Sequence, residues 1–338
     1  MILSKWWFIF VIFTVNTHKS YGDKTVDLVG DSVYDAVSKD LFDKVKVFCL
    51  VLTGKENKKN RAIPQKNTFL KRCNKYLFVS SVEDPDLPSI GIKVKESRNT
   101  LFAKIKFGMK YVYKNYYQKY DWFLRIDDDS YVIMENLRMF LLTQNTSEPA
   151  VHGFRFHSMM KGSKKGLVHG GAGTVISKEG LKRLVTESFP NPTKCRQDGG
   201  GLDDRELSFC LEMVGVYPSD TRDYKDRQMF HINPPDNYAT TRKVQAVKYF
   251  IKNGYYPMSQ GMAYMTDYPI SFHRIYGDMM YSMDYLLYKA NVIGRSSSYL
   301  QRLISSRDRS NLIQAAKKGI RKFAFEYTGE SERQWDLA

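Results

Sequence analysis

Three consecutive aspartates, Asp127, Asp128 and Asp129, combine residue type and spacing in a way that suits chemistry. They directly follow an apolar and aromatic run, residues 122–126, that is typical of a buried strand. Alternate side chains of an extended chain share a face, so Asp127 and Asp129 should point together and Asp128 away. Adjacent carboxylates repel one another, and hard cations such as Mg²⁺ or Mn²⁺ bind oxygen ligands together with substrate phosphates. The pattern predicts a divalent-cation site; a solvated acidic turn is the alternative.

A second acidic pair, Asp203 and Asp204, follows the glycines at 199–201 and begins an expected helix that reaches residue 214. A carboxylate there could act as a general base. Acids also favour helix N-termini because of the helix dipole, so a structural cap is the alternative. His273 ends a strand-like run, residues 268–273, where a single histidine is more often structural than a ligand.

Glycines and aromatic residues mark further candidate binding segments. Gly170, Gly171 and Gly173 precede an expected strand at 174–176; close approach of a ligand or positive φ would explain them, and a flexible hinge is the alternative. The turn Thr53-Gly54 follows the strand-like run 45–52 and could offer backbone amides to a ligand. Tyr255 and Tyr256 could present flat faces to a sugar, although core packing explains them equally well. The sequence lacks a G-x-G-x-x-G motif, so a Rossmann dinucleotide site is unsupported.

Strand-like and helix-like segments alternate along the chain. Strands are expected near residues 45–52, 76–80 and 122–126, and helices near 55–69, 101–117 and 135–142, with a further helix from about 177 to 187. This alternation predicts an α/β fold with a mostly parallel sheet.

The 338-residue chain is 43% hydrophobic and carries a net charge of +16, but its basic residues are scattered and accompany no nucleic-acid-binding motif. We therefore expect no nucleic-acid partner. An apolar run at residues 6–15 is too short for a full membrane span and indicates a signal peptide or short signal anchor over residues 1–22. Residues 23–44 are interpreted as a stem, 45–290 as the catalytic domain, and 291–338 as a basic tail with an amphipathic helix at 310–325.

The chain has an even number of cysteines, Cys49, Cys73, Cys195 and Cys210, without paired C-x-x-C spacing. Two disulfides are the simplest interpretation in an exported chain, and a zinc site is improbable. Asn145 begins the single N-x-S/T glycosylation sequon, which agrees with exposure in the secretory pathway.

Taken in order, these segments resemble the core 1 β1,3-galactosyltransferase family over residues 45–290. The resemblance rests on Val51 to Gly54, Arg72 to Lys75, Asp121 to Leu124, Asp127 to Asp129, Gly170 to Gly173, Asp203-Asp204, Asp220 to Asp223 and Ser271 to His273. It implies a GT-A glycosyltransferase fold and an inverting enzyme. The implied reaction uses Mn²⁺ and transfers galactose from UDP-galactose to the 3-hydroxyl of GalNAcα-Ser/Thr on glycoproteins.

The resemblance also implies a role for each matching residue. Asp127, Asp129 and His273 would hold the metal, and Asp204, with Asp203 beside it, would deprotonate the acceptor. The implied nucleotide and donor positions are Thr53, Gly54, Lys104, Asp128, Gly171, Ala172 and Gly173. Arg155, Tyr255 and Tyr256 are assigned to the acceptor. The implied disulfides are Cys49–Cys73 and Cys195–Cys210.

The sequence departs from the family pattern at Phe69, Ala103, Phe154, Thr174 and Tyr264-Met265. These departures leave acceptor preference and efficiency open. A catalytically silent relative that acts as a folding partner, and a transferase for another donor or acceptor, are the alternatives. A type II Golgi membrane protein is expected, with secretion after signal cleavage as the alternative, and a homodimer stays open.

Overall fold

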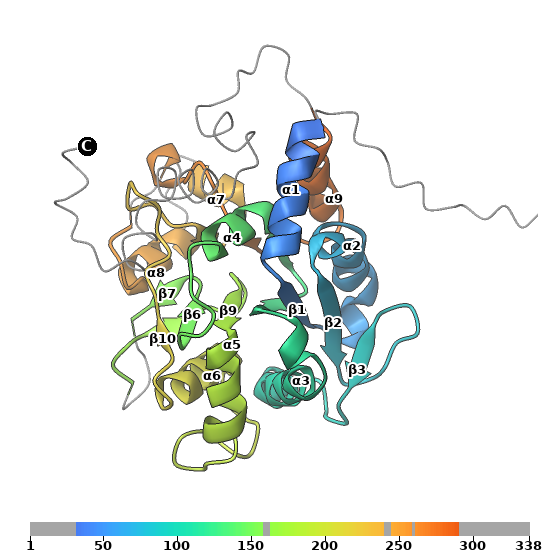
Figure 1. Cartoon of the computed structure of the whole chain (residues 1–338), viewed down its shortest axis with the longest axis vertical. Helices are drawn as coiled ribbons and strands as arrows, with labels where there is room; N and C mark the ends of the chain where they lie inside the picture. The colour runs from blue at the N-terminus through green and yellow to red at the C-terminus, as the bar shows by residue number, and fades with distance from the viewer. Residues whose placement is uncertain (1–31, 158–162, 240–244, 259–260, 291–338) are drawn as a thin grey trace, which may run out of the picture.

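The computed structural model describes residues 32–157, 163–239, 245–258 and 261–290 (Figure 1). None of the helices among these residues is long and apolar enough to cross a membrane. The apolar run at 6–15 and the amphipathic segment at 310–325 lie outside the described residues.

The main sheet has seven strands among the described residues, in the order β10-β6-β9-β4-β1-β2-β3. β9 runs antiparallel to its neighbours β4 and β6, and the other pairs are parallel. The expected mostly parallel α/β sheet is therefore confirmed. Its strands are β1 (Val47–Leu52), β2 (Lys75–Ser80), β3 (Ser89–Gly91), β4 (Trp122–Asp127), β6 (Ala150–His152), β9 (Thr174–Ser177) and β10 (Tyr217–Pro218).

Helices cover both faces of this sheet, which explains why all six residues of β1 are buried. Alternate β1 side chains enter two different cores: Val47 and Val51 pack with residues of α1 and α4, whereas Leu50 packs with residues of α3, α5 and α6. Figure 1 shows the two groups of helices on opposite sides of the sheet. The helices are α1 (Ser32–Lys44), α2 (Ile63–Asn67), α3 (Leu101–Tyr116), α4 (Met134–Leu141), α5 (Lys178–Arg183), α6 (Asp203–Glu212), α7 (Pro235–Ala239), α8 (Gln245–Asn253) and α9 (Asp278–Tyr288).

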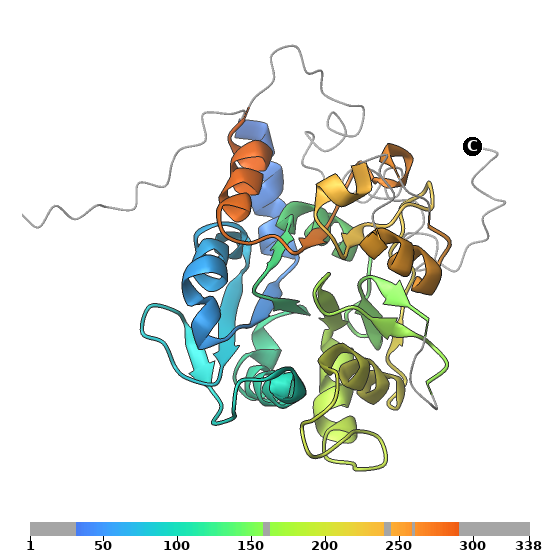
Figure 2. The same ribbon diagram turned by 180° about the vertical axis from the view of Figure 1, so that it is seen from behind.

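The stem assigned to residues 23–44 needs correction at its end, because its last part is helix α1. Val37 and Leu41 of this helix are buried in the same core as β1, and Ser38 donates a hydrogen bond to Glu135 of α4. At the other end, α9 continues to Tyr288, within the domain assigned to residues 45–290. Seen from behind, α9 lies beside α1 and α2 (Figure 2).

The helix expected at 55–69 is confirmed in broken form. A 3₁₀ turn (Lys55–Asn57) and a π-helical turn (Lys58–Ala62) precede α2, and a second 3₁₀ turn (Phe69–Arg72) follows it. Both disulfides are present, as the resemblance implies: Cys49–Cys73 links β1 to the chain before β2, and Cys195–Cys210 links α6 to the preceding loop.

A second sheet joins three strands that are distant in sequence, β5 (Ser130–Val132), β11 (Phe230–His231) and β12 (Ser271–His273). β5 pairs antiparallel with β12, and this register places His273 opposite Ser130. A hairpin of β7 (Arg155–Phe156) and β8 (Leu167–Val168) leads into residues 170–173, here called the glycine segment. The fold thus brings His273 next to the three aspartates.

Candidate functional site

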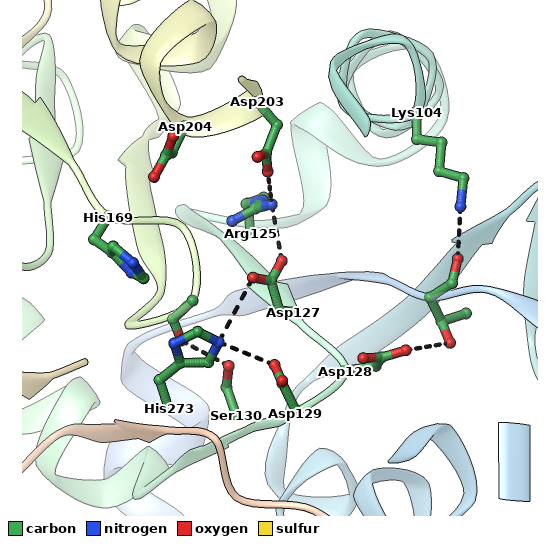
Figure 3. A network of polar contacts seen from close by, with 12 residues as sticks. Lys104, Arg125, Asp127, Asp128, Asp129, Ser130, His169, Asp203, Asp204 and His273 are labelled. Atoms are coloured by element: carbon green, nitrogen blue, oxygen red, sulfur yellow. Dashed lines mark hydrogen bonds and ion pairs between the residues drawn. The ribbon is translucent and has the colours of Figure 1, made fainter. Parts of the chain in front are cut away.

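The three aspartates form the turn between β4 and β5. Gln65 of α2 holds this turn, because its side-chain amide donates to the carbonyls of Asp127 and Ser130, both at 2.8 Å. Asp127 and Asp129 face His273, whereas the buried Asp128 accepts a 2.7 Å hydrogen bond from the Thr53 hydroxyl (Figure 3). The opposite orientations expected from strand geometry are therefore observed.

Asp127, Asp129 and His273 form the candidate metal cluster. His273 Nε2 lies 3.1 Å from Asp129 Oδ1 and 4.0 Å from Asp127 Oδ2. If each residue offers one ligand atom, a carboxylate oxygen or an imidazole nitrogen, these three atoms lie within 4.8 Å of one another. Two carboxylates and one imidazole are a donor set that suits Mn²⁺ and related divalent cations. The residues present therefore fit the metal that the resemblance implies.

Arg125 is a site residue that the sequence interpretation missed. Its buried guanidinium pairs with Asp127 at 2.8 Å and also bonds to the carboxylate of Asp203. A signal was available: Arg125 lies two residues before Asp127 in one strand, so the two side chains share a face. A buried charge needs such partners, and Arg125 links the metal cluster to the second acidic pair.

Arg61 was also missed, and it pairs with the other two aspartates. Its Nη1 lies 3.0 Å from Asp129 and 3.3 Å from Asp128. Burial outweighs these contacts at Asp128 and raises its pKa to about 6. Burial alone would also raise the pKa of Asp129, but the hydrogen bond and charge of His273, with the charge of Arg61, lower it.

Asp203 and Asp204 begin α6 and line the same cavity as the metal cluster. The N-cap residue of α6 is Leu202, which makes no capping hydrogen bond through its side chain. Neither aspartate is therefore the N-cap. Asp204 accepts the backbone N–H of Arg205 at 2.8 Å. Burial, followed by the adjacent Asp203 charge, raises the pKa of Asp204 above its usual value, which favours proton uptake.

The glycine segment packs directly against site side chains. A methyl group at Gly171 would overlap the imidazole of His273, and Gly173 has a φ of 95°, a conformation that side chains disfavour. The hydroxyls of Ser130 and Ser271 donate to the carbonyls of Gly171 and Ala172 at 2.6 and 2.5 Å. These ties make the segment a fixed wall rather than a hinge.

The cavity has a volume of about 700 Å³ and lies beyond the carboxyl ends of β1 and β4. Of the expected nucleotide-side residues, Thr53, Gly54, Lys104, Asp128 and Gly171 line it, whereas Ala172 and Gly173 are absent from its described lining. Lys104 donates to the Thr53 carbonyl at 2.9 Å and pairs with Glu96, which neutralises its charge. Lys104 therefore supports the Thr53 turn.

The expected acceptor residues lie together, but none of them is in the described lining of the cavity. The Arg155 guanidinium stacks 3.5 Å from the Tyr255 ring centroid and donates to the Tyr256 hydroxyl at 3.2 Å. Phe156, the next residue of β7, faces the cavity, because neighbouring strand side chains point to opposite faces.

His169 is a third residue that the sequence interpretation did not identify, and it lines the cavity. Its ring lies 5.4 Å from that of His273, centroid to centroid. Burial, followed by the charges of His273 and Arg125, holds the pKa of His169 well below 6.5, so the ring is neutral at pH 7.

Known proteins resemble this chain in sequence and in fold. The Fringe-like family profile matches residues 42–273. Glycoprotein-N-acetylgalactosamine 3-beta-galactosyltransferase 1 of Xenopus laevis is 36% identical over 276 residues, which cover 81% of this chain and 75% of that protein. Human chondroitin sulfate synthase 3 is 28% identical over 209 residues, 57% of this chain and 23% of that protein. A solved glycosyltransferase involved in glycosylation of the PBCV-1 major capsid is similar at 13% identity with a TM-score of 0.36, covering 81% of this chain and 99% of that chain.

The mostly parallel sheet and the Asp-x-Asp cluster, together with these sequence matches, define an α/β glycosyltransferase of the GT-A fold. The chain belongs to the Fringe-like family. The identity with the Xenopus protein confirms the resemblance to the core 1 β1,3-galactosyltransferase family.

Proposed function

We propose that this protein transfers galactose from UDP-galactose to the 3-hydroxyl of GalNAcα-Ser/Thr on glycoproteins, with inversion. The name of its Xenopus relative gives the transferred sugar, the N-acetylgalactosamine of a glycoprotein as acceptor, and the 3-beta linkage. The observation that carries the proposal is that one cavity contains both a candidate metal cluster and, across Arg125, a separate acidic pair. A metal-dependent inverting transferase needs both a cation site for the diphosphate and a base for the acceptor.

Asp127, Asp129 and His273 would hold the metal, and Mn²⁺ is the ion we propose. When bound, it would neutralise the negative charge of the UDP diphosphate as this becomes the leaving group. Thr53 and Gly54, supported by Lys104 and Asp128, would form the nucleotide side of the cavity, and residues 171–173 of the glycine segment the wall beside the donor sugar.

Asp204 would be the general base. Burial raises the pKa of both acids, which suits proton uptake from the acceptor hydroxyl, but Asp203 is occupied by its ion pair with Arg125. The acceptor oxygen would attack C1 of the α-linked galactose as the bond from C1 to the phosphate oxygen breaks. Asp204 takes the hydroxyl proton, UDP leaves, and the single displacement yields a β1,3 linkage.

The cellular setting that we propose is the secretory pathway, specifically the Golgi lumen, with residues 1–22 as a type II anchor or a cleaved signal. Two disulfides among the described residues support an oxidising compartment. Arg155, Tyr255 and Tyr256 would contact the peptide of the acceptor outside the cavity, and Asn145 would carry a glycan.

The test is transfer of galactose from UDP-galactose to a GalNAcα-Ser/Thr glycopeptide by the purified protein, with Mn²⁺ and then with EDTA. We expect a chelator-sensitive β1,3-linked product, identified by linkage analysis. A panel with UDP-glucose and UDP-N-acetylhexosamines would reveal a different donor. Folded protein without product from any donor would overturn the proposal and favour a folding partner without catalysis.

A further inference from the structure

His169 occupies a position on the cavity wall that the proposed reaction does not yet use. It belongs to the segment between β8 and β9, and its backbone N–H is anchored to the Phe154 carbonyl at 2.9 Å. Figure 3 shows its ring between Asp204 and His273, on the opposite side of Arg125 and Asp127 from Lys104. His169 therefore lies far from Lys104, which supports the Thr53 turn on the nucleotide side, and beside the glycine segment.

The hydrogen bonding of His169 determines which ring nitrogen carries the proton. Its Nδ1 lies 3.2 Å from the backbone nitrogen of Ala172, and because that N–H can only donate, Nδ1 must accept. The proton of the neutral ring is therefore on Nε2. Among the described residues Nε2 has no hydrogen-bond partner, so this donor is free to bind a ligand in the cavity that the ring lines.

The surroundings of His169 suit a sugar. The ring centroid of His169 lies 5.7 Å from that of Phe156 and 6.4 Å from that of Phe250, and both phenylalanine side chains line the cavity. A pyranose combines apolar C–H faces with hydroxyl and carbonyl oxygens, so it needs aromatic surface together with a few fixed donors. A diphosphate, by contrast, would be recognised by cations, whereas His169 offers a neutral donor.

We propose that His169 Nε2–H donates a hydrogen bond to an oxygen of the acceptor hexopyranose and that Phe156 and Phe250 form the apolar wall of this acceptor-sugar subsite. His169 would thereby turn the attacking hydroxyl towards Asp204. This inference rests on the proposed function and deepens it, because it places the acceptor sugar inside the cavity and leaves Arg155, Tyr255 and Tyr256 for the peptide.

Two substitutions distinguish sugar binding by His169 Nε2–H from the hydrogen bond that His169 Nδ1 accepts from Ala172 of the glycine segment. In His169→Asn the amide oxygen can replace Nδ1 and accept from Ala172, but nothing replaces Nε2–H. In His169→Gln the amide N–H reaches the position of Nε2, and the bond to Ala172 is lost. The measurements are binding of methyl α-GalNAc to protein saturated with UDP and Mn²⁺, by saturation-transfer NMR titration, and binding of UDP by calorimetry.

We expect His169→Asn to weaken methyl α-GalNAc binding about five- to tenfold, as one lost neutral hydrogen bond implies, with UDP affinity within about twofold of wild type. His169→Gln should keep sugar affinity within about twofold of wild type. In the transfer assay, the Asn variant should show a raised acceptor KM and an unchanged KM for UDP-galactose.

The opposite order would overturn the inference: unchanged sugar affinity in His169→Asn, with weaker UDP and sugar binding in His169→Gln, would show that His169 only supports the loop. If wild-type protein transfers galactose to GalNAcα acceptors while both variants bind the sugar normally, the inference fails and the proposed function stands. If wild-type protein neither transfers to nor binds the GalNAcα glycoside, both fail.

Discussion

Asp204 differs from the other acids of the site in having no ion pair among the described residues, whereas Asp127 and Asp203 share Arg125, and Asp128 and Asp129 share Arg61. A nearby positive charge favours the ionised form of a carboxylate and burial favours its protonated form; at Asp128 burial prevails although Arg61 lies close. At Asp204 burial and the Asp203 charge raise the pKa and no ion pair among the described residues opposes them, which suits a group that accepts a proton.

Replacement of one residue of each kind should have different effects. Asp129→Ala should abolish Mn²⁺-dependent binding of UDP, because a metal ligand is lost. Asp204→Asn should leave UDP affinity within about twofold and lower kcat at least 100-fold, as expected for loss of a general base. Calorimetric titration with UDP and steady-state kinetics test both. Loss of UDP binding in Asp204→Asn, with folding intact, would contradict the assignment of a base.

The pKa of Asp128, about 6, predicts a pH-dependent stability of the metal-free protein. A carboxyl whose pKa is higher in the folded than in the unfolded chain binds its proton more tightly when folded. Its contribution is therefore present at low pH and lost as the pH rises through about 6. The side chain of Asp128→Asn does not ionise, so the variant does not lose stability as the pH rises. In EDTA, its melting temperature relative to that of wild type should therefore increase from pH 5 to pH 7.5. A pH-independent difference would show that Asp128 is ionised throughout this range.

Two segments far apart in sequence, the Asp127–Ser130 turn and β12, supply the metal cluster, and the glycine segment is packed between them. The antiparallel pairing of β12 with β5 fixes His273, and the hydroxyls of Ser130 and Ser271 fix the backbone of the glycine segment. Each element therefore limits the positions open to the others.

Gly171→Ala tests this packing, because the added methyl group would overlap the His273 imidazole. We expect Mn²⁺ affinity to fall at least tenfold as His273 is displaced, measured by Mn²⁺ titration followed by electron paramagnetic resonance. Gly200→Ala is the matched control, since a methyl group there would only make ordinary contacts at 3.5 Å. Equal Mn²⁺ affinity in both variants would show that His273 is not a ligand.

Helix α1 should contribute to domain stability, because its buried side chains belong to the same core as β1. Leu41 is 2% exposed, so Leu41→Ala should lower the free energy of unfolding by about 2–5 kcal/mol, as for other buried leucines. Lys39→Ala, on the exposed face of the same helix, should change it by no more than about 0.5 kcal/mol. Urea denaturation measures both. A detached stem would show no difference between the two variants.

For the molecule as a whole, the site joins parts that the chain builds separately: the main sheet supplies Asp127 and the three-stranded sheet supplies His273. A ligand bound across them stabilises only the assembled protein. Ligand binding should therefore be coupled to global unfolding.

Mn²⁺ at about 100 times its dissociation constant should stabilise the folded protein by about 2.7 kcal/mol. For a domain of this size, that free energy corresponds to a rise in melting temperature of about 5–10 °C. EDTA should reverse the rise, and Asp129→Ala should show none. Scanning calorimetry makes the comparison, and an equal rise in the variant would locate the stabilising ion elsewhere.

Several features of the protein follow from local order along the chain: the alternating strands and helices, the acidic turn after a buried strand, the opposite orientations of Asp127 and Asp128, and the acids at the start of α6. Strand and helix periodicity is encoded in neighbouring residues, so these features could be predicted. The resemblance supplied His273 and the disulfide pairs, which spacing alone did not determine.

Which distant residues meet depends on the folded structure. Arg61 and Arg125 look like scattered basic residues in the sequence. They become partners of the aspartates only because the π-helical turn Lys58–Ala62 and α6 pack beside the end of β4. His169 becomes a candidate sugar ligand, and Arg155 lies outside the cavity, because the β7–β8 hairpin points alternate side chains in opposite directions. Such contacts depend on long-range strand register and helix packing, which local sequence patterns do not specify.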